Sequence, residues 1–391
     1  MLLEEVKANL NDCIRPFWHK LVDKEFGGFY GQVDFDLQVH KQSEKGVILN
    51  SRILWFFSNS FSLLPNEDDR ACADHAFDYL VNHCLDKEYG GVYWSTHYDG
   101  TPLDTTKHTY NQAFAVYALS SYYAASKKQE ALDIAFQLFE LIEEKCTDEY
   151  GYTESFDRQF QPVENDKLSE NGIIAEKTMN TLLHVFEAYT ELYRVSKDER
   201  VKDKLVWILN TFVDKVYNEG KRRQDVFFDR EMNNLIDLHS YGHDIETAWL
   251  LDRGLEVLGD AELERKVSPM TQALTKNIYE LARQEDGSVV NECENGVVDR
   301  RRIWWVQAES VVGFLNGYQK NQEKKEYLQA AKAAWEYIKK NVVDDRSGSE
   351  WFSELNDDGQ PAGKEDIVQP WKCPYHNGRM CLEVIKRNID A

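Results

Sequence analysis

Positive charge is in short supply in this sequence of 391 residues. It contains 46 Lys and Arg against 68 Asp and Glu, which gives a formal net charge of -22. Such a surplus of negative charge repels phosphate backbones and anionic lipid headgroups, so we expect neither nucleic acid nor a membrane surface as a partner. The sequence also lacks any apolar run long enough to span a bilayer.

Secretion signals and disulfide patterns are missing as well. The first residues, "MLLEEVKANLND", are amphipathic and acidic, without a basic segment followed by an apolar one. Seven cysteines are scattered along the chain, and no two of them form a CxxC pair. This odd number favours free thiols in a reducing compartment over a disulfide framework, so we expect a cytoplasmic protein.

The common signatures of cofactor sites are absent too. The chain has no GxGxxG or GxxxxGK loop for a nucleotide and no GxSxG turn for a nucleophilic serine. His239 and His243 lie four residues apart, but no HExxH motif follows and no dense aspartate cluster offers oxygen ligands. We therefore expect no cofactor and no metal.

What the sequence does contain is a repeat. The segment "DKEFGGFYGQVD" at residue 23 returns as "DKEYGGVYWSTH" at 86 and, more weakly, as "TDEYGYTESFD" at 147, with further echoes at 222, 283 and 345. Each copy is an acidic turn followed by alternating aromatic or β-branched residues, which predicts a short hairpin. The turn glycines of five copies are Gly27, Gly90, Gly151, Gly287 and Gly348, and the fourth copy lacks one.

Two helical segments separate successive copies. In the first pair, residues 45–64 are apolar on nearly every side, whereas residues 68–86 carry a charged stripe. Twelve helices in six such pairs, one kind buried and the other half solvated, predict an all-α fold of two concentric rings, an (α/α)6 barrel with short β-hairpins at the loops and residues 1–391 as one domain. An open solenoid is the alternative, but its end repeats would be polar, and here they are as aromatic as the rest.

Polar and aromatic residues gather at the first turns of the predicted inner helices, which all begin at one mouth of the barrel. The segment "HSYGHDIETAWLLDR" shows the pattern, since His243, Glu246 and Trp249 lie three residues apart on one side of a helix. Each residue alone has an ordinary structural explanation, but their recurrence at one rim indicates a site for proton transfer on a neutral sugar. The candidates are Arg52, Tyr110, Asn180, His184, His243, Glu246, Trp249, Trp305, Glu309, Trp371 and His376.

Several motifs resemble a known family. "SYGHDIETAWLLDR", "WWVQAESVVGF" and "PWKCPYHNGRMCLEVIKR", with "KGVILNSRILWFFS" and others, are similar to the cellobiose-type branch of the N-acylglucosamine 2-epimerase superfamily, from about residue 10 to 388. The superfamily fold is an (α/α)6 barrel. The resemblance implies reversible inversion at C2 of the reducing-end glucose of cellobiose, giving 4-O-β-glucosyl-mannose, with lactose as a further candidate substrate. We expect a monomer.

The resemblance also implies a role for each candidate residue. His243 and His376 match the two general acid/base histidines, and Arg52 and His184 match the groups that hold the C1 and C2 oxygens. Glu246 and Glu309 match carboxylates that orient these groups or sugar hydroxyls. Aromatic surfaces for the sugar rings and further pocket contacts are implied at Trp305, Trp371, Tyr110, Asn180 and Trp249.

These residue types suit the implied chemistry. A C2 proton is acidic only when C1 is a carbonyl, so the sugar ring must open before a planar cis-enediolate forms. Arg52 is permanently charged and suits that oxyanion, while two histidines on different helices can serve opposite faces of C2. Both histidines lie near predicted helix N-termini, where the positive end of the helix dipole favours neutral imidazole.

Three other classes of function compete with this interpretation. Glu246 and Glu309 could be the carboxylate pair of an inverting glycoside hydrolase, although the three rim histidines would then have no task. A non-catalytic binding protein on a helical solenoid would not need so crowded a rim. The sister activities of the superfamily, N-acylglucosamine 2-epimerase and mannose isomerase, use the same early steps.

Overall fold

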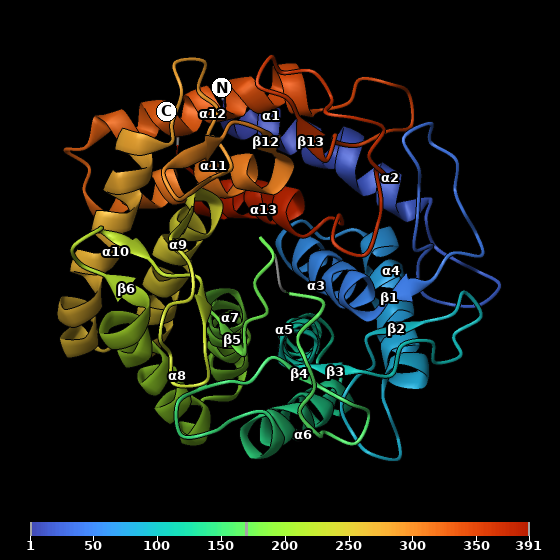
Figure 1. Ribbon diagram of the computed structural model, residues 1–391. Helices are drawn as coiled ribbons and strands as arrows, with labels where there is room; N and C mark the ends of the chain where they lie inside the picture. Colours follow the sequence, from blue (N-terminus) through green and yellow to red (C-terminus); the bar gives the residue numbers. More distant parts are fainter. Residues whose placement is uncertain (1, 169–170, 390–391) are drawn as a thin grey trace.

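The computed structural model describes residues 2–168 and 171–389, which form two concentric rings of helices (Figure 1). Consecutive inner helices contact one another, and the last of them, α13, contacts the first, α3, so the ring is closed. The inner helices are α3 (Val47–Leu63), α5 (Thr109–Ser126), α7 (Met179–Ser196), α9 (Tyr241–Leu258), α11 (Trp304–Lys320) and α13 (His376–Arg387).

Each outer helix packs on the inner helix that precedes it in the chain. The sixth pair is different, because α1 at the start of the chain packs on α13 at its end, which brings the two termini together (Figure 1). The outer ring comprises α1 (Leu2–Asn9), the π-helical turn η1 (Leu10–Ile14) and α2 (Arg15–His19); α4 (Glu67–Tyr79) with η2 (Leu80–Cys84); α6 (Gln129–Lys145); α8 (Glu199–Thr211) with η3 (Phe212–Val216); α10 (Ala261–Leu281); and α12 (Lys325–Tyr337) with η4 (Ile338–Val342). The predicted (α/α)6 barrel is confirmed.

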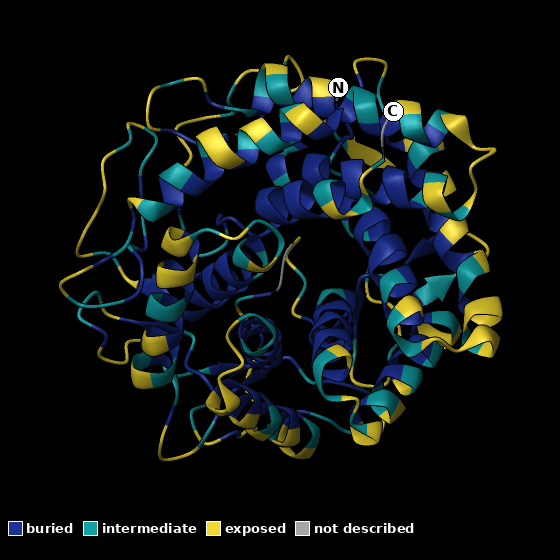
Figure 2. Cartoon of the chain, turned by 180° about the vertical axis from the view of Figure 1, so that it is seen from behind, coloured by how far each residue is buried: buried dark blue, intermediate teal, exposed yellow. Residues whose placement is uncertain are grey.

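Burial explains which helices form each ring. In α5, every residue from 109 to 122 is buried, because neighbouring inner helices and the outer ring cover all its sides. The outer helix α6 buries a stripe at helical spacing, including Ala131, Ile134, Leu138 and Ile142, and exposes its charged face. Figure 2 shows the same division around the barrel, with buried inner helices and exposed outer faces. Within the described residues, every helix is too short or too polar to cross a membrane.

All six predicted turns are present. Single antiparallel bridges close five of them, at Val22–Phe29, Leu85–Val92, Thr147–Tyr152, Arg283–Val289 and Val343–Trp351. The fourth is a two-stranded hairpin of β6 (Tyr217–Asn218) and β7 (Arg223–Gln224), so it begins earlier than the sequence echo at 222. There Arg222 has a positive φ of 52°, a conformation that Gly27 supplies in the first turn with a φ of 81°.

Most of the short strands join neighbouring repeats, which the repeat pattern did not predict. The segment before each inner helix pairs antiparallel with a segment beyond the next turn, and the bridge between Val33 and Val368 completes the circle. The pairs are β1 (Lys45–Gly46) with β2 (Ser95–Thr96), β3 (Lys107–His108) with β4 (Ser155–Phe156), β5 (Lys177–Thr178) with β8 (Phe227–Phe228), β9 (Leu238–Ser240) with β10 (Glu292–Glu294), and β12 (Arg302–Ile303) with β13 (Glu354–Leu355); β11 (Val297–Asp299) adds to β10.

Buried ion pairs account for the acidic character of the turns. Lys45 lies immediately before α3, and its Nζ donates to Asp23 Oδ2 at 2.6 Å and to the Gly27 carbonyl at 2.8 Å, with both charged side chains buried. Buried pairs recur before two other inner helices, in Lys107–Asp86 and Lys372–Glu350, and Lys177 forms a similar pair with the half-buried Asp148. Each pair fixes the start of an inner helix against the turn of its own repeat.

Replacing Lys45 with Met should therefore destabilise the protein strongly. The change leaves Asp23 buried without its cation, and breaking a buried pair in this way costs about 3–5 kcal/mol. Chemical denaturation followed by circular dichroism measures the free energy of unfolding. The control is Lys24→Met on the exposed side of the same turn, and equal stability of the two variants would contradict the role of the pair.

Candidate active site

The mouth of the barrel holds a cavity of about 340 Å³ at the first turns of the inner helices. Nine of the eleven predicted residues line it, and together they come from all six inner helices or the residues just before them. They are Arg52, Tyr110, Asn180, His184, His243, Glu246, Trp305, Trp371 and His376.

The other two predicted residues lie behind the cavity wall. Trp249 was expected to be a pocket contact, but its indole is only 1% exposed and donates from Nε1 to Glu309 Oε2 at 2.8 Å. Its ring faces the Arg379 guanidinium, 4.8 Å from the ring centre. Trp249 therefore supports Glu309 from below, where the helical spacing alone made it look like a member of the rim.

The cavity also has walls that the sequence did not predict. Apart from Trp304, the first residue of α11, these residues come from loops and strand ends, where no helical period marks which side chain points inward. They are Lys167, Leu168, Ile303, Trp304, Ser353, Glu354, Glu365 and Gln369.

Two of the cavity histidines are oriented by buried carboxylates. Nδ1 of His376 lies 2.8 Å from Glu309 Oε1, and Nδ1 of His184 lies 2.9 Å from Glu187 Oε2. Because an ionised carboxylate only accepts hydrogen bonds, Nδ1 of each imidazole carries the hydrogen. The lone pair of Nε2 is then left for the cavity, as a general base requires.

The third histidine has a neutral partner. Nδ1 of His243 lies 2.7 Å from the hydroxyl oxygen of Ser240, the residue before α9. A hydroxyl can both donate and accept, so this contact supports His243 with either ring nitrogen protonated. His243 is therefore equipped both to remove and to return a proton through Nε2.

Burial sets the charge of these imidazoles. It lowers the pKa of His243 to about 3, and burial followed by the nearby Arg379 holds the pKa of His376 well below its usual range. Burial also lowers the pKa of His184, although Glu187 opposes the shift. All three are neutral at pH 7, but burial, and not the helix dipole that the sequence suggested, is the main cause.

Arg52 is a buried cation held by neutral groups. Its guanidinium donates to the Tyr110 hydroxyl at 2.8 Å and to the Trp371 carbonyl at 3.3 Å, and it lies over the rings of Phe114 and Tyr375. Among the residues that the structure describes, no carboxylate forms an ion pair with it, and its side chain borders the cavity. Its positive charge is thus available to an oxyanion in the cavity.

A second guanidinium, Arg379 on α13, organises the floor of the site. Its Nη1 donates to Glu187 Oε1 at 2.5 Å, and its Nη2 donates to Glu309 Oε1 at 2.6 Å and also to Glu246 Oε1. Neither Arg379 nor Glu187 is among the eleven candidates named from the sequence. The signal was available, because Glu187 continues the spacing of Asn180 and His184 along one face of α7.

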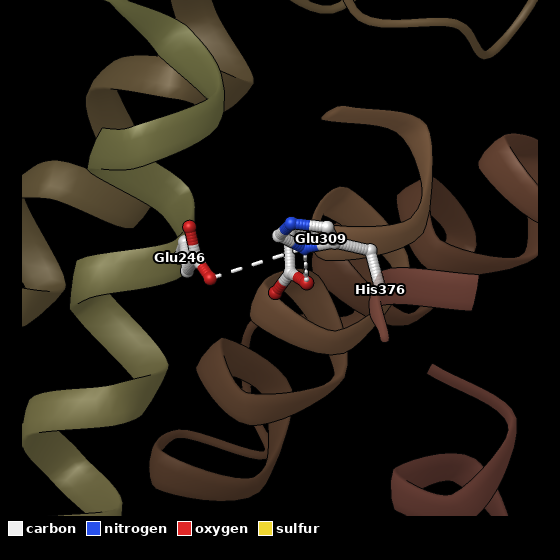
Figure 3. Close-up of side chains that lie close together, drawn as sticks. All are labelled: Glu246, Glu309 and His376. Atoms are coloured by element: carbon white, nitrogen blue, oxygen red, sulfur yellow. Dashed lines mark hydrogen bonds and ion pairs between the residues drawn. The ribbon is translucent and has the colours of Figure 1, made fainter. Parts of the chain in front are cut away.

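Glu246, Glu309 and His376 lie close enough together to raise the question of a metal (Figure 3). One ligand atom from each lies within 4.8 Å of the others. However, Oε1 of both carboxylates already accepts from Arg379 Nη2. A metal ion here would have to compete with the positive charge of that guanidinium.

The indole of Trp305 separates the two predicted acid/base histidines. Its ring centre lies 4.8 Å from that of His243 and 5.4 Å from that of His376. Gly242 makes this packing possible, because a Cβ at that position would lie 2.5 Å from Trp305 Cη2. The glycine of the "SYGHDIE" motif is therefore needed for the position of the indole.

We expect Gly242→Ala to displace Trp305 and weaken disaccharide binding. Losing an aromatic contact of this kind costs about 1 kcal/mol, so the apparent KM should rise roughly five- to tenfold. Steady-state kinetics would measure this, with Gly220→Ala as the control, since a Cβ there meets no atom closer than 3.6 Å. A KM for Gly242→Ala equal to that of the control would show that the indole position does not matter.

Comparison with known proteins places this barrel in a family. The family model described as N-acylglucosamine 2-epimerase matches residues 28–377. A curated relative, cellobiose 2-epimerase from Ruminococcus albus, is 50% identical over the full length of both chains. Two solved structures superpose closely: a sugar epimerase from a ruminal bacterium, with a TM-score of 0.98, 49% identity and full coverage of both chains, and cellobiose 2-epimerase from Bacillus thermoamylovorans, with a TM-score of 0.96, 45% identity and 99% coverage of each. The chain belongs to the N-acylglucosamine 2-epimerase family and is a carbohydrate epimerase.

Proposed function

We propose that this protein reversibly epimerises C2 of the reducing-end glucose of cellobiose and related β-1,4-linked disaccharides, giving the mannose epimer. The observation that carries the proposal is that two imidazoles on different inner helices, His243 and His376, and the buried guanidinium of Arg52 surround one cavity. The names of the relatives at 45–50% identity support cellobiose as the substrate.

The geometry suggests how each group acts. After the ring opens, Nε2 of His376 removes the C2 proton of the gluco epimer, and Arg52 and His184 hold the oxygens of the resulting enediolate. The negative charge of that intermediate favours uptake of a proton from solvent by His243, and the resulting imidazolium delivers this proton to the opposite face of C2, while His376 releases the proton that it removed to solvent. The reverse reaction exchanges the tasks of the two histidines.

The carboxylate arrangement argues against a glycoside hydrolase. An inverting hydrolase keeps its two carboxyl groups about 6.5–9.5 Å apart to leave room for water. Here Glu246 and Glu309 have oxygens within 4.8 Å of each other, and both accept from Arg379. Glu309 also lies behind the wall, where it holds His376 and Trp249.

Every group in this proposal comes from one chain, and none requires a cofactor. We therefore propose that the whole chain acts as one catalytic domain and that a monomer is active.

Mannose isomerase activity differs only in the carbon that receives the proton, so the decisive observation is the product. Incubation with cellobiose should give 4-O-β-glucosyl-mannose as the main product on chromatography, and a ketose as the main product would contradict C2 epimerisation.

Activity should survive removal of metal ions. The acid, the base and the oxyanion partner are all side chains, so dialysis against EDTA should change kcat by less than about twofold. The measurement is epimer formation before and after dialysis, with the metal content of the protein followed in parallel. Loss of turnover that a single divalent ion restores would overturn the metal-free mechanism.

Single histidine variants in D2O test the two-base mechanism. His243→Ala should still exchange deuterium into C2 of cellobiose through His376, but form little epimer, because no group delivers a proton to the other face. His376→Ala should do the converse with 4-O-β-glucosyl-mannose. NMR of C2 and product chromatography report the two events, and His40→Ala, an exposed histidine, is the control. Epimer formation by either variant at more than about a tenth of the wild-type rate would point to one base serving both faces.

A further inference from the structure

Ser240 occupies the N-cap position of α9, but its side chain does not cap the helix. A serine hydroxyl at this position usually accepts a hydrogen bond from a free backbone N–H of the first turn. The Ser240 hydroxyl makes no such bond, and instead Nδ1 of His243 lies 2.7 Å from its oxygen. His243 is the third residue of α9. The hydroxyl thus meets the side chain of the residue whose backbone it would ordinarily cap.

The usual arrangement is present elsewhere in the barrel. Among the residues that the structure describes, every other α-helix that begins after an Asn, Asp or Thr is capped by that side chain. In α7, Thr178 Oγ1 accepts from the backbone N–H of Thr181 at 3.0 Å. The helices α4, α8 and α10 are capped in the same way by Asn66, Asp198 and Asp260. A cap stabilises its helix, so α9 forgoes that stabilisation while Ser240 binds an imidazole of the cavity.

The backbone around Ser240 is held on several sides. Ser240 is the last residue of β9, where it pairs with Glu292 of β10, and α9 begins with the next residue. The backbone carbonyl of His243 accepts from Gln224 Nε2 at 3.4 Å. Ser240 is also buried, with 7% of its surface exposed. Its hydroxyl is therefore a partner of fixed position for the imidazole.

The imidazole of His243 depends on this hydroxyl for its orientation. Among the described residues, the contact with Ser240 is the only hydrogen bond that the ring forms. The indole of Trp305 packs with its centre 4.8 Å from that of the imidazole, but an apolar contact does not distinguish a ring nitrogen from a ring carbon. Only the hydrogen bond to Nδ1 selects one of the two flipped positions of the ring. In that position Nε2 is left for the cavity, which His243 lines.

The two acid/base histidines are held by partners of different charge. Nδ1 of His376 lies 2.8 Å from the carboxylate of Glu309, whereas Nδ1 of His243 contacts the neutral hydroxyl of Ser240. A carboxylate partner stabilises imidazolium, and a hydroxyl fixes the ring without that added stabilisation. The imidazolium of His243 therefore remains a strong acid, as delivery of a proton to carbon requires.

We propose that Ser240 is a positioning residue for the manno face of C2: its hydroxyl holds Nδ1 of His243, so that Nε2 reaches C2 when a proton is removed from that face or delivered to it. Ser240 is not one of the residues that line the cavity, so it acts through His243 and does not touch the sugar. This role rests on the proposed epimerase activity. It gives His243 an orienting residue of its own, as Glu309 is for His376.

Deuterium exchange in D2O separates the two faces of C2. Ser240→Ala should exchange C2 of cellobiose within about threefold of the wild-type initial rate, because His376 serves that face. Its exchange at C2 of 4-O-β-glucosyl-mannose, and its epimer formation from either sugar, should fall about five- to tenfold, as expected for the loss of one hydrogen bond. NMR of C2 and product chromatography measure these rates. An equal loss of exchange on both sugars, or no loss on either, would overturn the role.

Two variants serve as controls for the hydroxyl. Ser240→Thr keeps it, so exchange at C2 of 4-O-β-glucosyl-mannose should return to within about threefold of the wild type. Thr178→Ala removes the ordinary cap of α7 and should leave the ratio of the two exchange rates unchanged. A selective loss in Thr178→Ala, or no rescue by Ser240→Thr, would overturn the role. If Ser240→Ala does not fold, Ser240→Cys replaces it, because a thiol is a weak acceptor, and the same selective loss is expected.

NMR of the histidine ring nitrogens tests the contact without any sugar. In protein with isotopically labelled histidine, the ring nitrogen shifts of His243 should change in Ser240→Ala and return toward the wild type in Ser240→Thr, while those of His376 stay the same. The signals of His243 are identified by their loss in His243→Ala. Unchanged shifts in Ser240→Ala would show that the hydroxyl does not hold the ring. If the wild type forms no epimer from cellobiose, the proposed function is wrong, and these shifts still decide whether Ser240 orients His243.

Discussion

One guanidinium, that of Arg379, is the interaction on which the site depends. It extends from α13 to carboxylates on α7, α9 and α11, so it joins four of the six inner helices at the floor of the cavity. Two of those carboxylates orient histidines, and the third faces the cavity itself. Without this cation, three carboxyl groups would be buried together with no positive charge beside them, and the two that orient imidazoles would each lose a hydrogen-bond donor.

The barrel as a whole could be predicted because each repeat in the sequence corresponds to one repeated structural unit. An acidic turn, a helix apolar on all sides and a helix with one charged stripe each leave a distinct mark in the sequence, and six copies leave little choice of architecture. The strands that join neighbouring repeats could not be predicted in the same way. Strands of two or three residues, such as Lys45–Gly46, are too short to show an alternating pattern.

The site residues likewise fall into those that a sequence pattern predicts and those that it does not. Residues at helical spacing, such as Asn180 and His184, were predicted because a helix fixes which side chains share a face. The period does not tell how deep a side chain lies, and so Trp249 was placed in the cavity although its indole supports Glu309 from behind. Loop residues such as Lys167 and Gln369 have no period at all, and only the folded chain brings them to the cavity wall.

The ring of strand pairings at the mouth has a consequence for how the barrel can vary. These pairings hold the starts of the inner helices at fixed spacing. Among the described residues, no strand pairs join the opposite ends of the same helices. The positions of the inner helices are therefore fixed most tightly at the mouth of the barrel. The far end is free to change its loops and surface, and the distance between the acid/base groups at the mouth stays the same.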